Sequence, residues 1–332
     1  ARKLRELMYA SFFVADHATH FYALGGPDFV VGPDAPKGER NILGVVRKVG
    51  REVGGQVMQL LKDNHEIAAI IGGRYIHSVG ALVGGMSKPI TEEEREQIIE
   101  RAKRSVETAK FSLKLFDDVV LANRTYVDLI LSDAFSHRTY YMGLVDENNK
   151  INFYDGSVRV VGPDGAELVK YRPEQYMDVV AEHIEPWTYL KFPYLKAVGW
   201  KGLVDGPDSG IYRATPLSRL NASNGMATPL AQAEYERFYA TLGGKPVHAT
   251  LATHWARLVE LLYAAERALE LAEDPTITDT NVRTLPTATP DEGVGIVEAP
   301  RGTLTHHYIT DEQGLLKQVN LIVGTTNNYA AL

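Results

Sequence analysis

Apolar residues recur at helical spacing over five stretches of the chain. They predict helices at residues 2–24, 41–64, 91–123, 229–242 and 250–273. Gly25, Gly26 and Pro27 supply the expected end of the first helix. Thr91 and Glu94 have the spacing of a capping box, which marks the start of the third helix.

Strand-forming residues gather in two other parts of the chain. Residues 138–171 contain short β-branched runs broken by turn-forming clusters, which predicts a small antiparallel meander. Residues 303–309 and 315–323 predict a hairpin, because a turn-forming cluster lies between them. If these strands pair antiparallel, Arg301 and Thr325 come out at the same end of the ribbon.

The segments between these elements have less regular patterns. Glycine pairs interrupt residues 70–89, which indicates a loop, and residues 274–293 form a polar, proline-bearing stretch. Aromatic residues and prolines fill residues 185–202, which we expect to be an irregular packed segment. The whole pattern predicts a helix-dominated α+β protein, with a bundle of long helices and small antiparallel sheets in a single domain over residues 1–332.

Composition narrows the class of protein. The 332 residues include 45% hydrophobic side chains, enough for a sizeable core, and the formal charge of −7 argues against a general nucleic-acid-binding surface. No apolar stretch is long enough for a membrane span and no signal peptide is evident, so we expect a cytoplasmic protein. The chain has no cysteine, which removes disulfides and thiolate ligands from its own chemistry.

Two histidine-bearing segments are candidates for a site. In "ADHATHFYAL", Asp16 and His20 lie four residues apart on one helix face, with His17 beside them, so they form either a structural hydrogen-bonded pair or a site. "GGRYIHSVGALVGG" lacks the Gly-Lys-Ser/Thr ending of a phosphate-binding loop, and its His77 is either a hydrogen-bonding strut or a metal ligand. No histidine pair has the helical spacing of a zinc enzyme.

Two further segments have alternative interpretations. The aromatic run "TYLKFPYL" fits a core or an interface, and it also fits a surface that stacks on a flat ligand. Arg301 stands between a proline that fixes its approach and a glycine that permits close backbone contact. Its guanidinium is therefore either a rigidly held functional group or a surface charge at the start of a strand.

Taken together, these segments resemble blocks of the large subunit of nickel-iron hydrogenases. The resemblance rests on "DHATHFY", "GGRYIHSVGALVGG", "YLKFPYL", "ATPLSRLNAS", "EAPRGTLTHHY" and "NLIVGTT" followed by "NN". It extends over essentially the whole chain and is strongest for the cytoplasmic branch that includes F420-nonreducing and heterodisulfide-reductase-associated enzymes. The Pro-Arg-Gly block with its downstream Thr-Thr is specific in combination, whereas each block alone is weak.

The resemblance implies a nickel-iron centre whose iron carries carbon monoxide and cyanide. The family holds this centre through four thiolates from two Cys-x-x-Cys motifs, one near each end of the large subunit, and neither motif is present in this chain. The chain begins without Met, inside a helical pattern. We therefore expect residues 1–332 to be a segment truncated at both ends, lying between the two motifs.

The resemblance also assigns roles to residues. Arg301 matches the arginine suspended over the open nickel position, and Asp16 matches the carboxylate that pairs with it. The residues that match the pocket around the diatomic ligands are Pro300, Leu304, Val323, Gly324 and Thr325, with the Thr325 hydroxyl as a donor to cyanide. Leu321 matches a residue whose main-chain carbonyl touches a magnesium site. Gly324 and Ser78 stand where many relatives have proline, which is expected to loosen the walls of the pocket.

The implied activity is reversible heterolytic cleavage of dihydrogen, with electrons passed to an iron-sulfur small subunit. We expect that subunit to dock on the first helix and neighbouring loops, with further heterodisulfide-reductase-like subunits in the complex. A metal-free structural or quinone-adjacent subunit of an electron-transfer complex is the alternative, because it would explain the missing cysteines without truncation. An unrelated helical binding protein would require the resemblance to be chance.

Overall fold

A computed structural model describes residues 1–332, which divide into two compact units. Residues 1–128 and 257–286 form the helical unit, and residues 129–256 and 287–332 form the mixed unit. The expected single domain stays a prediction. None of the helices is both long and apolar enough to cross a membrane.

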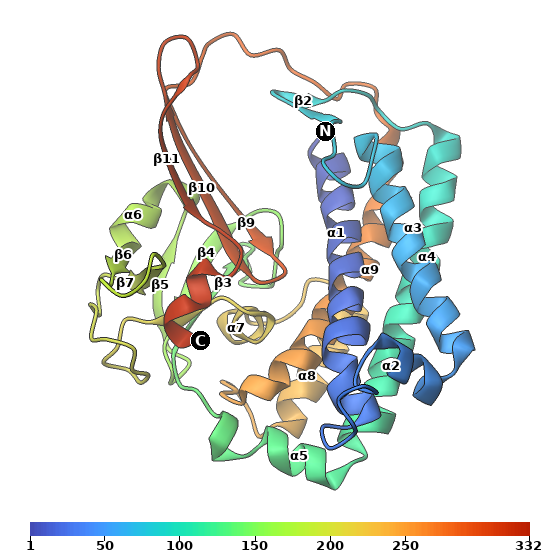
Figure 1. The fold of residues 1–332 in the computed structure, drawn as a ribbon. Helices are drawn as coiled ribbons and strands as arrows, with labels where there is room; N and C mark the ends of the chain where they lie inside the picture. The colour runs from blue at the N-terminus through green and yellow to red at the C-terminus, as the bar shows by residue number, and fades with distance from the viewer. The chain divides into compact units, whose positions relative to one another are not determined.

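Long helices dominate the helical unit, and α1, α3 and α4 run side by side (Figure 1). The helices of the unit are α1 (Arg2–Thr19), α2 (Ile42–Val49), α3 (Arg51–Gly72), α4 (Glu92–Phe116), α5 (Arg124–Ile130) and the part of α9 (Thr253–Glu273) from Arg257 onward. Their shared core consists of fully buried aliphatic side chains, among them Leu4, Leu7, Ile67, Ile71, Ile98 and Leu271. A two-residue hairpin, β1 (Ala81–Leu82) and β2 (Gly85–Met86), occupies the expected glycine-rich loop.

The predicted bounds of the first two helices in this unit are wrong. The first helix does not end at Gly25, because helical backbone continues through the π-type turns His20–Gly25 and Pro27–Val31. In a π-type turn each N–H bonds five residues back, as the Gly26 N–H does to the Phe21 carbonyl, and Pro27, which has no N–H, begins the second turn. The second predicted helix is two helices, since Gly50 adopts φ +93° between α2 and α3. In addition, α3 continues to Gly72 instead of ending at the predicted Asn64.

The start of α4 agrees with its sequence signal. The Glu94 amide donates to Thr91 Oγ1 at 3.1 Å, and the Thr91 amide donates to Glu94 Oε2 at 2.9 Å. These reciprocal bonds are the predicted capping box, which satisfies amides at the first turn that have no partner within the helix. The helix then runs to Phe116 and continues as the π-type turn Asp117–Leu121.

The mixed unit contains the predicted meander. Strands β3 (Tyr140–Val145), β4 (Ser157–Val161) and β5 (Glu167–Tyr171) pair antiparallel in sequence order, and the short β8 (Tyr212–Arg213) adds to β3 in parallel. All six residues of β3 are buried, as expected of an inner strand. The helices of this unit are α6 (Tyr176–Val179), α7 (Pro216–Ala222) and α8 (Pro229–Thr241), with the first four residues of α9.

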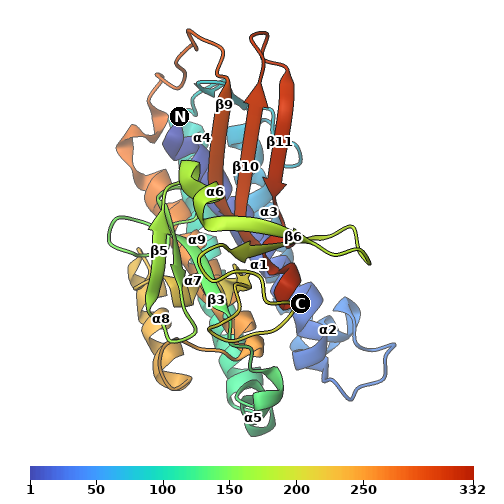
Figure 2. The same ribbon diagram turned by 90° about the vertical axis from the view of Figure 1, so that its left-hand side faces the viewer.

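Two sheets of the mixed unit differ from expectation. The aromatic segment is not irregular, because β6 (Val180–Ile184) pairs with β7 (Lys191–Leu195). Pro193 lies within β7 and is tolerated because a two-stranded sheet leaves one side of each strand without a ladder. The predicted C-terminal hairpin is confirmed as β10 (Gly302–Thr310) and β11 (Leu316–Ile322), and β9 (Glu292–Ala299) adds an unpredicted third strand (Figure 2).

Candidate functional site

Pro300 and Arg301 form the connection between β9 and β10. The last strand pair is Ala299 with Gly302, so only these two residues make the turn. Pro300 and Gly302 are buried, whereas Arg301 is exposed. A Cβ on Gly302 would lie 3.0 Å from the carbonyl oxygen of Gly324, so glycine allows the segment after β11 to approach the turn closely.

Three consecutive carbonyl groups of the turn accept hydrogen bonds from side chains. Arg219, on α7, donates from Nη1 to the Ala299 carbonyl at 2.9 Å and from Nη2 to the Pro300 carbonyl at 3.2 Å. Asn328 donates from Nδ2 to the Arg301 carbonyl at 2.7 Å. The backbone on both sides of the Arg301 side chain is therefore held by two different elements.

Arg219 is itself held by a buried carboxylate. Its Nη1 lies 3.1 Å from Glu298 Oε2, and both side chains are completely buried. The other oxygen of Glu298 accepts from the Leu144 amide at 2.6 Å and from Thr303 Oγ1 at 2.9 Å. A buried ion pair with this many additional hydrogen bonds recovers much of the cost of removing both charges from water.

The Asn-Asn pair after β11 belongs to the same network. The asparagines lie in the 3₁₀ turn Thr326–Ala331, at the foot of the sheet in Figure 2. Asn328 Oδ1 accepts from the Ala214 amide at 2.8 Å. Asn327 accepts from the Tyr212 hydroxyl at 2.7 Å and donates to the Thr303 carbonyl at 2.7 Å. Both asparagines thus connect the start of β10 to the segment around β8.

The remaining predicted pocket residues lie around this turn or further along the hairpin. Thr305 pairs with Ile322, a register that leads toward Gly302 on one strand and Thr325 on the other. The predicted convergence of the two ends is therefore confirmed as geometry, while the roles assigned to the residues stay predictions. Leu304, Val323, Gly324 and Thr325 are partly exposed, and Leu321 is 40% exposed.

Asp16 lies on α1 in the helical unit and is partly exposed. Burial raises the pKa of Tyr75, and the negative charge of Asp16 raises it further. The Tyr75 ring in turn stacks on His65 with ring centroids 3.7 Å apart. Because Asp16 and Arg301 belong to different units, their pairing stays a prediction.

The buried ionisable residue beside Asp16 is His17. Its Nε2 lies 2.9 Å from Glu260 Oε2 on α9, and both side chains are completely buried. Arg257 Nη1 lies 3.5 Å from His17 Nδ1. The sequence does contain a signal for this residue, since His17 continues the buried stripe through Leu7, Ala10 and Val14. The spacing of four residues predicts His20 instead as the partner of Asp16.

The glycine-rich segment brings backbone close to backbone. Added Cβ atoms on Gly84 and Gly85 would lie 1.8 Å from the Thr284 carbonyl oxygen and 2.0 Å from the Val282 carbonyl oxygen. His77 is exposed, and its backbone has φ +52°. Its carbonyl accepts a hydrogen bond from Arg74 Nε at 2.8 Å. These observations favour the structural interpretation of the segment.

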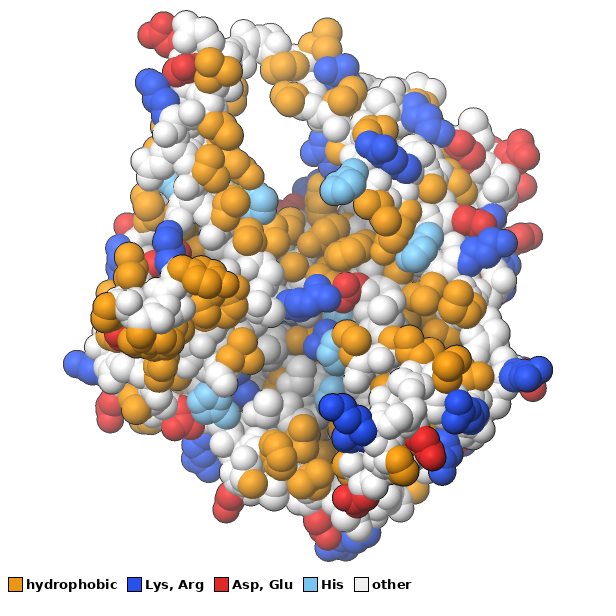
Figure 3. All heavy atoms as spheres, in the orientation of Figure 1, with side chains coloured by type: hydrophobic (Ala, Val, Ile, Leu, Met, Phe, Trp, Pro, Cys, Tyr) orange, Lys and Arg blue, Asp and Glu red, His pale blue; other side chains and the backbone are white.

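The aromatic segment divides between a buried strand and an exposed connection. Phe192 and Leu195 on β7 are buried, whereas Trp187 and Tyr189 are 65% and 96% exposed. Hydrophobic side chains gather over the β6–β7 connection on the left of the face drawn in Figure 3. The strand therefore contributes to the core, and the connection presents an apolar surface.

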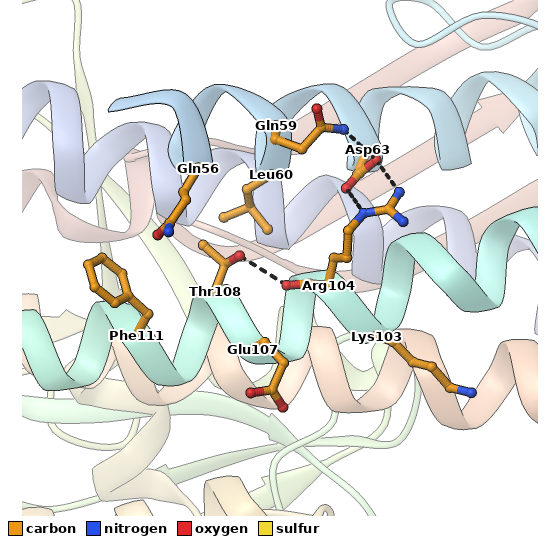
Figure 4. Close-up of a pocket in the computed structure, with 9 residues that line it drawn as sticks. All are labelled: Gln56, Gln59, Leu60, Asp63, Lys103, Arg104, Glu107, Thr108 and Phe111. Atoms are coloured by element: carbon orange, nitrogen blue, oxygen red, sulfur yellow. Dashed lines mark hydrogen bonds and ion pairs between the residues drawn. The ribbon is translucent and has the colours of Figure 1, made fainter. Parts of the chain in front are cut away.

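A groove of about 490 Å³ lies between α3 and α4 (Figure 4). Its most buried charged group is Asp63, whose two oxygens accept from Arg104 at 2.8 and 2.9 Å. Gln59 donates to the same carboxylate at 3.0 Å. This pairing joins the two helices, and we assign the charged residues of the groove a structural role.

The chain offers no ligand set for a metal ion. It has no cysteine, and no group of three or more His, Asp or Glu side chains is arranged to hold a metal. A nickel-iron centre held by thiolates therefore does not fit the residues present as its ligands. The turn at Pro300 and Arg301, whose three carbonyls are bound by Arg219 and Asn328, is called the clamped turn.

Comparisons with known proteins agree on one family. The model described as nickel-dependent hydrogenase matches residues 143–331. The chain is 45% identical over its whole length to an F420-non-reducing hydrogenase iron-sulfur subunit of Archaeoglobus profundus, of which it covers 68%. It is 41% identical to an F420-non-reducing hydrogenase vhu subunit of Methanocaldococcus jannaschii, again over its whole length and covering 76% of that relative.

The fold has a close match among solved structures. An NAD⁺-reducing [NiFe]-hydrogenase in the H₂-reduced state superposes with a TM-score of 0.91 at 33% identity, covering all of this chain and 71% of that one. The predicted fold class, helix-rich with small antiparallel sheets, is confirmed.

Proposed function

Because the chain belongs to the nickel-dependent hydrogenase family, we propose that its intact parent catalyses the reversible heterolytic cleavage of dihydrogen at a nickel-iron centre. The centre, when bound, supplies the metal chemistry that polarises hydrogen. Its thiolate ligands are not among residues 1–332. The carbon monoxide and cyanide ligands and a nearby magnesium ion belong to the same proposal for the intact parent.

The observation that carries this proposal is the clamped turn at Arg301. A guanidinium remains protonated at neutral pH, so Arg301 provides a fixed positive charge beside the reacting atoms. Acting as the base instead would require strong desolvation, and the exposure of Arg301 in this chain favours the electrostatic role. We assign Asp16 the role of orienting the guanidinium through a charge-assisted bond.

The neighbouring residues are proposed to shape the pocket. Pro300, Leu304 and Val323 would provide apolar walls, and the Thr325 hydroxyl would donate to a cyanide ligand. Gly324 adopts φ +57°, a left-handed conformation that glycine reaches without strain. The main-chain carbonyl of Leu321 would lie near the magnesium ion.

The proposal includes partner subunits, since this chain has no thiolates to hold iron-sulfur clusters. We propose an iron-sulfur small subunit that docks on α1 and the neighbouring loops, further heterodisulfide-reductase-like subunits, and a cytoplasmic complex. Large exposed apolar side chains of the helical unit support a docking surface of this kind: Leu24, Ile42, Leu43, Ile76, Val79 and Val83.

The proposal is tested by Arg301→Lys in the intact parent enzyme. We expect hydrogen turnover to fall by at least about 100-fold, because a lysine does not reproduce the planar guanidinium at this position. Nickel content, measured by elemental analysis, should stay unchanged. Arg124→Lys is the control, because Arg124 is 88% exposed and pairs with Asp128 on its own helix. Undiminished turnover in Arg301→Lys would refute the assigned role.

A second candidate function follows from the absence of cysteine in residues 1–332. A metal-free structural or quinone-adjacent subunit of an electron-transfer complex would show the same absence. The two candidates differ in the nickel content of the intact protein and in the presence of Cys-x-x-Cys motifs in its full coding sequence. Nickel bound at one atom per protein supports the hydrogenase, and its absence supports the second candidate.

A further inference from the structure

The buried Arg219 side chain binds several polar acceptors in addition to its carboxylate partner Glu298. Its side chain is completely buried, and its guanidinium carbon lies 5.7 Å from the centroid of the Phe153 ring. Its two terminal nitrogens lie within hydrogen-bond distance of Glu298 Oε2 and of three carbonyl oxygens, those of Ala214, Ala299 and Pro300. A guanidinium is the side chain that can reach this many acceptors at once, because it presents five donors in a planar fork.

The acceptors lie where they control the Arg301 side chain. The carbonyls of Ala299 and Pro300 precede its Cα, and the carbonyl that follows its Cα is bound by Asn328. The backbone from which the long, exposed Arg301 side chain extends is therefore fixed from both directions. Since a displacement of about 1 Å at a reacting group can cost about 100-fold in rate, this fixation bears directly on turnover.

We propose that Arg219 and Asn328 are positioning residues that hold the Arg301 guanidinium in its working place, which rests on the function proposed above for Arg301. Glu298 supports them by neutralising and orienting Arg219. Neither positioning residue has a contact with the reacting atoms in this proposal. They act on the backbone of the turn, through the three consecutive carbonyls.

Two conservative substitutions remove these bonds with little change in volume. Arg219→Lys keeps the buried charge beside Glu298 and loses the fork of donors. Asn328→Asp keeps the oxygen that accepts from the Ala214 amide and loses the donor to the Arg301 carbonyl. In the intact parent enzyme, we expect each substitution to lower kcat by at least about tenfold while KM for hydrogen changes less than about twofold.

The mixed unit contains matched controls for both substitutions. Arg213 is 4% exposed and binds the His137 carbonyl, Thr139 and Thr250, so Arg213→Lys disturbs a comparable buried network whose donors do not bind the Pro300–Arg301 turn. Asn221 is 1% exposed and donates to the Val247 carbonyl at 2.8 Å, so Asn221→Asp is the counterpart of Asn328→Asp. The controls should lower thermal stability to a similar extent and leave kcat within about twofold of the wild type.

A second measurement does not depend on the metal centre. Trypsin cleaves after arginine, and cleavage between Arg301 and Gly302 requires the turn to open locally. Mass spectrometry of the intact enzyme should show this cleavage at least about tenfold faster in Arg219→Lys and Asn328→Asp than in the wild type or the controls. The cleavage rate can also be measured in a variant that assembles but has no hydrogenase activity.

The outcomes separate this inference from the proposed function. If Arg301→Lys loses turnover while Arg219→Lys and Asn328→Asp match their controls in kcat and cleavage rate, the positioning inference is wrong and the function stands. If Arg301→Lys keeps full turnover, the proposed function of Arg301 fails, and with it any catalytic consequence of the clamp. Faster cleavage together with a selective loss of kcat supports both.

Discussion

The buried contact between His17 and Glu260 allows a quantitative test of how α1 is held against α9. A carboxylate can only accept, so His17 Nε2 donates to Glu260 Oε2 at 2.9 Å. On the other side of the ring, Arg257 Nη1 lies 3.5 Å from His17 Nδ1. We therefore assign His17 the role of a donor to a buried carboxylate, located one residue after Asp16.

This assignment gives the free-energy cost of removing either partner of the contact. Replacing His17 with Leu fills a similar volume and removes a hydrogen bond to a charged group, a loss of about 1.5–3 kcal/mol. It also removes the edge-on contact with Phe13, whose ring centroid lies 5.2 Å away, which adds about 0.5–1.5 kcal/mol. Glu260→Met leaves the imidazole N–H without this acceptor and should cost about 1–3 kcal/mol.

The double variant tests whether His17 and Glu260 share one hydrogen bond. Because the shared hydrogen bond can be lost only once, His17→Leu combined with Glu260→Met should be more stable than the sum of the single losses by about 1.5–3 kcal/mol. Free energies of unfolding come from guanidinium denaturation of the full-length protein, followed by circular dichroism. The cycle on Asn64 and Ser105, a buried neutral pair with Nδ2 and Oγ 2.9 Å apart, provides a reference, expected at about half that coupling. A coupling below about 0.5 kcal/mol for His17 and Glu260 would refute the assignment.

Three other predictions concern the stability of the helical unit. Gly84→Ala should destabilise the protein by more than about 2 kcal/mol, because Gly84 has φ +83° and the new Cβ would lie 1.8 Å from the Thr284 carbonyl oxygen. Gly55→Ala should instead stabilise the protein by about 0.5–1 kcal/mol, because Gly55 lies on α3 with open space around it. Equal denaturation midpoints for the two variants would contradict this geometry. Thr91→Ala should cost about 1 kcal/mol through loss of the cap, whereas Thr91→Ser should retain it. Burial raises the pKa of Glu94, but the bonds from Lys88 and the Thr91 amide outweigh it and bring the pKa below the usual value. The contribution of Glu94 to folding stability is therefore fully present above about pH 4.3 and is lost as the pH falls through the lowered pKa. An acid titration of stability in which Glu94→Gln loses as much at pH 3 as at pH 6 would contradict this sign.

The long helices were predictable because their signal is local, whereas the short α5, α6 and α7 were not predicted. The capping box of α4 and the apolar stripes of α8 and α9 depend on residues three or four positions apart. The errors arose where tertiary structure overrode a local rule. Gly26 and Pro27 did not end the first helical stretch, and Pro193 did not prevent β7. β9 was missed because its glycines weaken the strand pattern.

The glycines of β9 have a tertiary explanation that no local pattern contains. Gly293 and Gly295 lie across from Tyr308 and His306 on β10. Rings placed opposite glycines can cover the backbone that the missing side chains leave open. The register that creates these pairs is set by the two-residue turn at Pro300 and Arg301. The strand could be recognised only once that turn was known to join two strands.

Part of the candidate site was predictable because its sequence signal is local. Arg301 between Pro300 and Gly302 is a local signal, and the hairpin brings Thr325 toward it through strand pairing. Arg219 carries no such signal, because nothing in "ATPLSRLNAS" distinguishes a buried arginine from a surface one. Its role depends on α7 packing against β3, where a Cβ on Gly143 would lie 2.9 Å from the Arg219 Cα.

The use of a buried ion pair beneath an exposed arginine has a physical rationale. Two well-packed apolar side chains in place of Arg219 and Glu298 would avoid the cost of removing two charges from water, and such replacements are often neutral or stabilising. Apolar side chains cannot, however, bind the carbonyls of Ala299 and Pro300, which would lose these donors. The pair therefore specifies the conformation of one turn more than it adds to overall stability. A turn that only connected two strands would not require that specification, whereas a turn that must hold a charge at a fixed point does.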